Sequence, residues 1–89
     1  MKSREISDID ARTEVLGFVQ KRHDGSTCPS EVARRLASKA GIPESWRGYM
    51  PVVHLAVDEL CAEGKISLSW KAVPMAKRDG PYRICKPRG

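Results

Sequence analysis

Cationic side chains gather near the C-terminal end of the sequence, and they are the side chains best suited to binding chemistry. Residues 1–45 carry eight basic and seven acidic residues, but from residue 65 to the end there are seven basic residues and one acidic residue. Lys71, Lys77 and Arg78 lie between two segments of alternating apolar residues. Cations in such a loop neutralise phosphates, which supply most of the sequence-independent affinity for nucleic acid. We therefore expect this stretch to contact a polyanion.

Residues that serve as nucleophiles or metal ligands are few and far apart. They are three cysteines and two histidines: Cys28, Cys61, Cys85, His23 and His54. None of the spacings among these five residues is typical of a zinc site. The three cysteines are odd in number and far apart in the sequence, which argues against a disulfide framework. Ser30 lies in the first turn of a predicted helix, where backbone hydrogen bonding accounts for it. We expect no enzymatic activity, no metal and no cofactor, and a reducing location, the cytoplasm.

The elements that position these residues begin with helical signals. Helices are predicted over four segments: residues 8–23, 29–40, 44–49 and 51–63. The second begins at Pro29, whose fixed φ suits a first helical position, and the third segment is only a single turn. Gly41 and Gly64 end helices because glycine adopts positive φ readily. This order of helix, turn and helix predicts a helix-turn-helix core.

The C-terminal part of the chain predicts a β-hairpin. Ile66, Leu68 and Trp70 alternate with polar residues, as do Tyr82 and Ile84, which is the period of a half-buried strand. We expect residues 71–81 to form one long loop between the two strands, and this loop is the wing.

A chain of 89 residues is long enough for one domain and too short for two cores. The fold class predicted is α+β, mainly α: a winged helix-turn-helix with a three-helix core and a two- or three-stranded β-wing. The domain is expected over residues 8–86, between an N-terminal tail at 1–7 and a C-terminal tail at 87–89. No run of about 18 apolar residues occurs, so we expect no membrane partner.

Four short motifs carry a family resemblance over residues 9–85. They are Cys28-Pro29-Ser30-Glu31-Val32-Ala33-Arg34, Trp46-Arg47 followed by Met50-Pro51, Leu60-Cys61-Ala62-Glu63-Gly64-Lys65-Ile66, and Gly80-Pro81-Tyr82-Arg83-Ile84. With these motifs the sequence resembles a family of small, largely uncharacterised bacterial winged-helix proteins. The resemblance implies a winged-helix fold and brings with it no substrate, reaction or catalytic residue.

Binding of double-stranded DNA is the first functional hypothesis, in a small module related to transcription. Arg47 and Tyr49 precede the helix expected to enter a groove, and Lys71, Lys77 and Arg78 lie in the wing. The exposed face of that helix has no Arg, Lys, Asn or Gln, which are the side chains that read base edges. We therefore expect phosphate contacts with limited base readout.

A protein-interaction module or homodimer on the same scaffold is the alternative hypothesis, without nucleic-acid binding. The same helix face presents an apolar strip bordered by acids: Val52, Leu55, Asp58, Glu59 and Ala62. Such a surface suits another protein better than a polyanion, and fold alone does not decide between the two functions.

Overall fold

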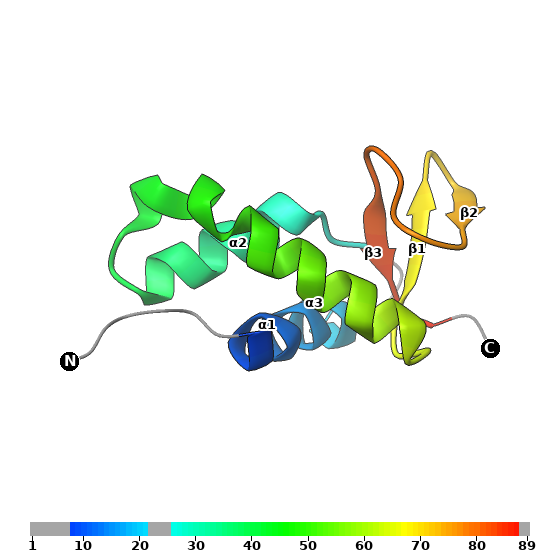
Figure 1. The fold of residues 1–89 in the computed structure, drawn as a ribbon, viewed down its shortest axis with the longest axis horizontal. Helices are drawn as coiled ribbons and strands as arrows, with labels where there is room; N and C mark the ends of the chain where they lie inside the picture. The colour runs from blue at the N-terminus through cyan, green and yellow to red at the C-terminus, as the bar shows by residue number, and fades with distance from the viewer. Residues whose placement is uncertain (1–7, 22–25, 88–89) are drawn as a thin grey trace.

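A computed structural model describes residues 8–21 and 26–87 of the chain. Its elements in order are α1 (Asp8–Lys21), α2 (Pro29–Lys39), the 3-10 helix η1 (Pro43–Tyr49), α3 (Met50–Ala62), β1 (Ser67–Trp70), β2 (Val73–Met75) and β3 (Arg83–Cys85). The sheet lies at one end of the molecule and η1 at the other, with α3 running between them (Figure 1). The tail predicted at 1–7 lies outside the described residues, as do residues 88 and 89 of the other tail.

Local sequence signals start α2 and end α2 and α3 within one residue of the predicted positions, whereas the end predicted for the first helix, near residue 23, lies outside the described residues. Pro29 is the first residue of α2, and the carboxylate of Glu31 accepts hydrogen bonds from the Cys28 amide at 3.3 Å and the Thr27 hydroxyl at 2.7 Å. The bond to the Cys28 amide satisfies the backbone donor of the N-cap residue, as in a capping box. Gly41 (φ 81°) and Gly64 (φ 75°) follow α2 and α3 in the left-handed region. The helix-turn-helix order is confirmed.

The three strands form an antiparallel sheet in the order β2-β1-β3. Leu68 pairs with Met75 on one side and with Ile84 on the other, so β1 is the central strand of the three. Thr27 adds an isolated bridge to Ile84, with N–H···O distances of 3.0 and 2.8 Å. Three helices followed by this sheet make the winged-helix α+β fold that the sequence predicts. In the structure the wing comprises residues 67–85, that is, the three strands and the segments that connect them, and not the predicted loop alone.

Strand β2 corrects one prediction, because residues 71–81 do not form a single loop. Lys71 (φ 52°) and Ala72 (φ 69°) both adopt positive φ and reverse the chain in two residues. Two successive positive φ values match the twist of a tight hairpin, which lets Val73 pair with Trp70. The sequence gives no sign of this turn, because such turns favour Asn and Gly, and because Pro74 weakens the case for a strand.

The positive φ of Ala72 is unfavourable for a non-glycine residue, which predicts that Ala72→Gly is more stable than wild type. A non-glycine residue in the left-handed region costs about 1–2 kcal/mol, and the extra freedom of glycine in the unfolded chain offsets roughly 0.5–1 kcal/mol of the gain. We expect urea denaturation to show an increase of about 0.5–1 kcal/mol in the free energy of unfolding. Ala76→Gly is the matched control, since Ala76 lies in the same wing without positive φ. Equal changes in the free energy of unfolding for Ala72→Gly and Ala76→Gly would contradict the presence of backbone strain at Ala72.

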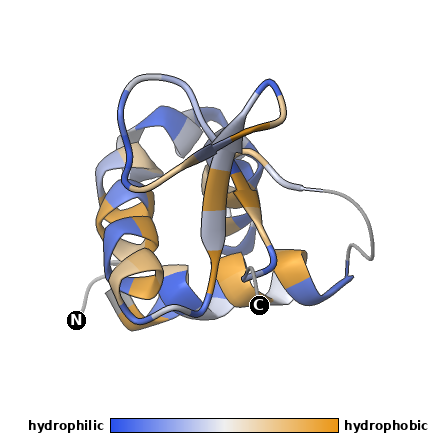
Figure 2. Cartoon of the chain, turned by 90° about the vertical axis from the view of Figure 1, so that its right-hand side faces the viewer, coloured by the Kyte–Doolittle hydropathy of each residue, from blue (hydrophilic) through white to orange (hydrophobic). Residues whose placement is uncertain are grey.

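The core lies between the three helices and the inner face of the sheet. Its fully buried side chains come from every layer, among them Val15 of α1, Leu36 of α2, Leu60 of α3, Leu68 of β1 and Ile84 of β3. Figure 2 views the molecule from the end that carries the sheet and shows apolar residues on the strands in front of the helices. Within residues 8–21 and 26–87, no helix has both the length and the hydropathy to cross a bilayer.

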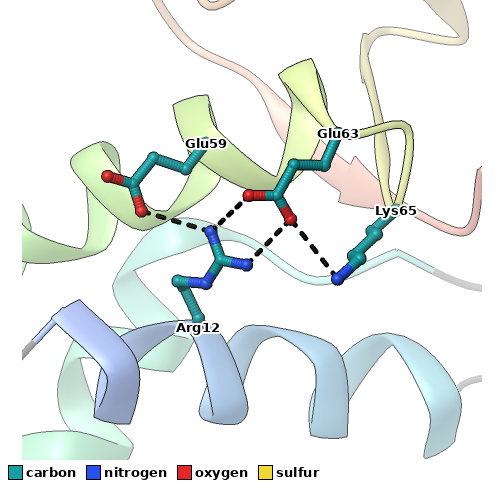
Figure 3. A network of polar contacts seen from close by, with 4 residues as sticks. All are labelled: Arg12, Glu59, Glu63 and Lys65. Atoms are coloured by element: carbon teal, nitrogen blue, oxygen red, sulfur yellow. Dashed lines mark hydrogen bonds and ion pairs between the residues drawn. The ribbon is translucent and has the colours of Figure 1, made fainter.

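An ion-pair network joins α1 to the C-terminal half of α3 (Figure 3). The guanidinium of Arg12 donates two hydrogen bonds of 2.8 Å to Glu63 and one of 3.2 Å to Glu59. Lys65 lies 3.4 Å from Glu63. The hydrogen bonds from Arg12 hold the pKa of Glu63 at about 2, below its ordinary value of 4.5. The network therefore keeps Glu63 charged well into acid.

This depressed pKa predicts how a Glu63→Gln variant differs from the wild type as pH changes. The carboxylate stabilises the fold fully above the unfolded pKa of 4.5, and that stabilisation is lost as the pH falls toward the folded pKa of about 2. Thermal denaturation should show wild type melting above the variant at pH 7, with the gap closing between pH 4.5 and pH 2. A gap of constant size over this range would rule out the linkage.

Candidate nucleic-acid interface

The five residues predicted to contact nucleic acid lie at the two ends of α3. Arg47 and Tyr49 belong to η1, directly before α3, and Lys71, Lys77 and Arg78 belong to the wing that follows it. In Figure 1, η1 and the wing project toward the same upper side of the molecule, away from α1. The fold thus brings these residues to both ends of one helix, but it does not gather them into one cluster.

Arg78 does not point freely to solvent, because it pairs with α3. Its Nε donates to Asp58 Oδ1 at 2.9 Å, and its Nη2 donates to Asp58 Oδ2 at 3.0 Å. The hydrogen bonds from Arg78 lower the pKa of Asp58, so the pair stays ionised at neutral pH. In this conformation the cation predicted to hold a phosphate is already neutralised by a carboxylate of the neighbouring helix.

Further contacts hold the wing against α3. Tyr82 Oη lies 2.7 Å from His54 Nδ1. Burial lowers the pKa of His54 and raises the pKa of Tyr82. Both groups are therefore uncharged at neutral pH. A hollow of about 300 Å³ lies between α3 and the wing, and six residues line it: Asp58, Cys61, Ala62, Ala76, Lys77 and Arg78.

Lys71 and Lys77 are the wing cations that remain available. Both side chains are exposed. Neither forms an ion pair with any residue in the described part of the chain. Lys71 Nζ lies 6.0 Å from the centroid of the Trp70 ring, at the tip of the β1–β2 turn. Two of the three predicted wing contacts therefore present open positive charge.

At the other end of α3, Trp46 contacts one of the predicted residues, Arg47. Arg47 Cζ lies 4.6 Å from the centroid of the Trp46 ring, and Arg34 Cζ of α2 lies 4.5 Å from the same centroid. Tyr49 is half-buried and packs against the core. The sequence suggests no contact between Arg34 and Trp46, because these residues are 12 positions apart on different elements.

The predicted protein-binding face of α3 is narrower in the structure than in the sequence pattern. Val52 packs partly against the core, and Glu59 pairs with Arg12 of α1. Leu55, Asp58 and Ala62 are exposed, with Leu55 at 50%. Asp58 is engaged by the wing. The open part of the face is therefore an apolar patch around Leu55.

The cysteines and histidines do not build a metal site in the part of the chain that the structure describes. No group of three or more His, Cys, Asp or Glu side chains comes together among residues 8–21 and 26–87. Cys28, Cys61 and Cys85 are free and half-buried. His23 lies outside the described residues, and His54 bonds to Tyr82.

Comparison with known proteins places the chain in a family. The family described as "Protein of unknown function (DUF3253)" matches residues 9–87. The chain belongs to this family. Its range in this chain runs from α1 through β3, so the DUF3253 match covers the whole winged-helix fold. No curated protein matches the sequence. The function of this DUF3253 domain must therefore be inferred from its own residues.

Proposed function

We propose that this domain binds double-stranded DNA through backbone phosphates held by its wing, with little base discrimination. The observation that carries this function is the position of two unpaired lysines on the wing. Among the exposed lysines of the described residues, Lys39 and Lys65 are paired with Glu14 and Glu63. The exposed lysines without an acidic partner there are Lys21, Lys71, Lys77 and Lys86, and of these Lys71 and Lys77 lie together on the wing. Unpaired cations in a wing beside a helix-turn-helix are suited to phosphate contacts.

The low base discrimination follows from the exposed stripe of α3. Pro51, Leu55, Asp58 and Ala62 occupy this stripe, and none of them forms the bidentate bonds by which Arg, Asn or Gln recognises a purine. Asp58 would repel phosphate were it not paired with Arg78. Affinity should therefore depend strongly on salt concentration and only weakly on DNA sequence.

The test is a fluorescence anisotropy titration of random duplex DNA with wild type and with Lys71→Gln/Lys77→Gln. Each phosphate contact contributes about 0.9 to the magnitude of the negative slope of log K against log salt concentration. The double variant should therefore have a slope that is shallower by about 1.8. At 0.1 M salt this corresponds to roughly 60-fold weaker binding. The matched control is Lys39→Gln/Lys65→Gln, which changes the net charge equally at lysines that already have partners.

Weaker binding by the wing variant together with wild-type binding by the control variant would support the proposed role of the wing, and wild-type binding by both variants would overturn it. Equal losses in both double variants would show that affinity follows net charge alone and would overturn it. Absence of binding by wild type at 50 mM salt would also overturn it, because electrostatic affinity is strongest at low salt.

Self-association through α3 is a second candidate function, favoured by the exposure of Leu55. This leucine is half-exposed in the middle of the open stripe, between Pro51 and Ala62. An exposed apolar patch on a helix suits a hydrophobic partner surface. Sedimentation of the wild type should then show a dimer that Leu55→Glu abolishes, while folding and DNA affinity stay unchanged. A monomeric wild type would remove this candidate.

A further inference from the structure

Trp46 of η1 has two arginines against its ring. Arg34 comes from α2 and Arg47 from η1, and their Cζ atoms lie 4.5 and 4.6 Å from the ring centroid. Both distances are within the range of a cation–π contact. Both guanidinium groups therefore contact the same aromatic ring, with their Cζ atoms no more than about 9 Å apart, on the exposed surface at the N-terminal end of α3.

The other arginines in the described part of the chain have a different environment. Arg12, Arg35 and Arg78 face carboxylates, and Arg83 donates to the hydroxyl and the carbonyl of Ser26. Arg34 and Arg47 have no acidic partner and no hydrogen bond among the described residues. Four of these six arginines therefore have acceptors within the fold, and the two that lack them share Trp46.

The chemistry of this arrangement favours an anion. A guanidinium that stacks through its flat face keeps its N–H groups free at the edge, where they form a fork that fits a phosphate. Stacking also orders the side chain before binding, which reduces the entropy lost when the anion arrives.

We propose that Arg34 and Arg47, stacked on Trp46, form a second phosphate-binding site for the same DNA duplex that the wing holds. This inference rests on the proposed function and extends it. The new site directly precedes α3, whereas the wing follows α3 and contacts it at His54 and Asp58. The major groove is about 12 Å wide between its two backbones, so a helix in the groove could place one cationic site on each strand.

The experiment uses Arg34→Gln/Arg47→Gln in the anisotropy titration with random duplex DNA. Loss of two phosphate contacts should make the salt slope shallower by about 1.8 and weaken binding roughly 60-fold at 0.1 M salt. The matched control is Arg35→Gln/Lys39→Gln, which removes two cations from the same helix α2 that already lie against Glu14. The control should retain the wild-type slope.

A second measurement does not depend on the arginine variants being folded. Trp70→Phe leaves Trp46 as the single tryptophan of the chain. We expect the emission of Trp46 to change as duplex DNA is added, with the same midpoint as the anisotropy curve. Binding of DNA without any change in this emission would overturn the inference.

The outcomes separate this site from the wing. If Arg34→Gln/Arg47→Gln binds as wild type does while Lys71→Gln/Lys77→Gln is weakened, the Trp46 site is wrong and the proposed function stands. If the arginine variant is weakened and the wing variant is not, the site is supported and the wing is wrong. If wild type binds no DNA, both proposals are wrong.

Discussion

Replacing Leu60 by alanine should lower the free energy of unfolding by about 2–5 kcal/mol. Leu60 is fully buried in α3 and belongs to the core that α3 shares with α1, α2 and the sheet. Truncation removes buried methyl groups and leaves a cavity that the surrounding elements fill only in part. Because α3 links η1 to the wing, this core position supports both ends of the proposed interface.

Urea denaturation followed by circular dichroism measures this loss. The matched control is Leu55→Ala, which is the same substitution on the same helix at a half-exposed position. Little apolar surface is buried there, so we expect a change of less than about 1 kcal/mol. Similar losses for the two leucines would contradict the placement of Leu60 inside and Leu55 outside.

Replacing Asp58 by asparagine should strengthen DNA binding, although the substitution removes a contact seen in the structure. Asp58 accepts two hydrogen bonds from Arg78 and neutralises it. Loss of the carboxylate charge frees Arg78 for a phosphate and removes one negative charge from the exposed stripe of α3. One additional contact should make the slope of log K against log salt concentration steeper by about 0.9 and raise the affinity at 0.1 M salt about eightfold. The pair is exposed, so stability should change by less than about 1 kcal/mol.

The control for this variant is Asp79→Asn. Asp79 is an exposed acid of the same wing, and it forms no ion pair with the described residues. Its neutralisation changes the net charge equally but frees no arginine, so we expect an unchanged salt slope. If Asp58→Asn and Asp79→Asn have the same slope as wild type, Arg78 is not a latent phosphate contact.

The helical part of this fold follows from the sequence because its signals are local. Pro29 at the start of α2 and Gly41 and Gly64 after the helices act through the conformation of their own backbone. The alternation around Leu68 likewise fixes which strand face is buried, since successive side chains point to opposite faces. These features need no knowledge of distant contacts.

The wing was predicted less well, because its geometry depends on tertiary pairing. The turn at Lys71 and Ala72 lacks the residues that mark such turns, and β2 exists because Val73 and Met75 find partners on β1. Propensity at these positions does not reveal the strand. Cross-strand packing outweighs the local cost, as it does where tertiary context overrides intrinsic preference.

The candidate site shows the same division. The sequence identifies Lys71, Lys77 and Arg78 as wing cations, but it cannot show that Arg78 pairs with Asp58, 20 positions earlier. Nor can it show that Arg34 meets Trp46. The charge and exposure of a side chain can partly be predicted from the sequence pattern. The pairing of a given cation depends on the folded arrangement of α2, α3 and the wing.

The most direct test of DNA binding is the salt dependence of wild-type affinity for a random duplex between 50 and 200 mM salt. Four phosphate contacts, from Lys71, Lys77, Arg34 and Arg47, predict that log K falls linearly against log salt concentration with a slope of about −3.6. A domain that does not bind at 50 mM salt, or binds with a slope near zero, would contradict the proposed function.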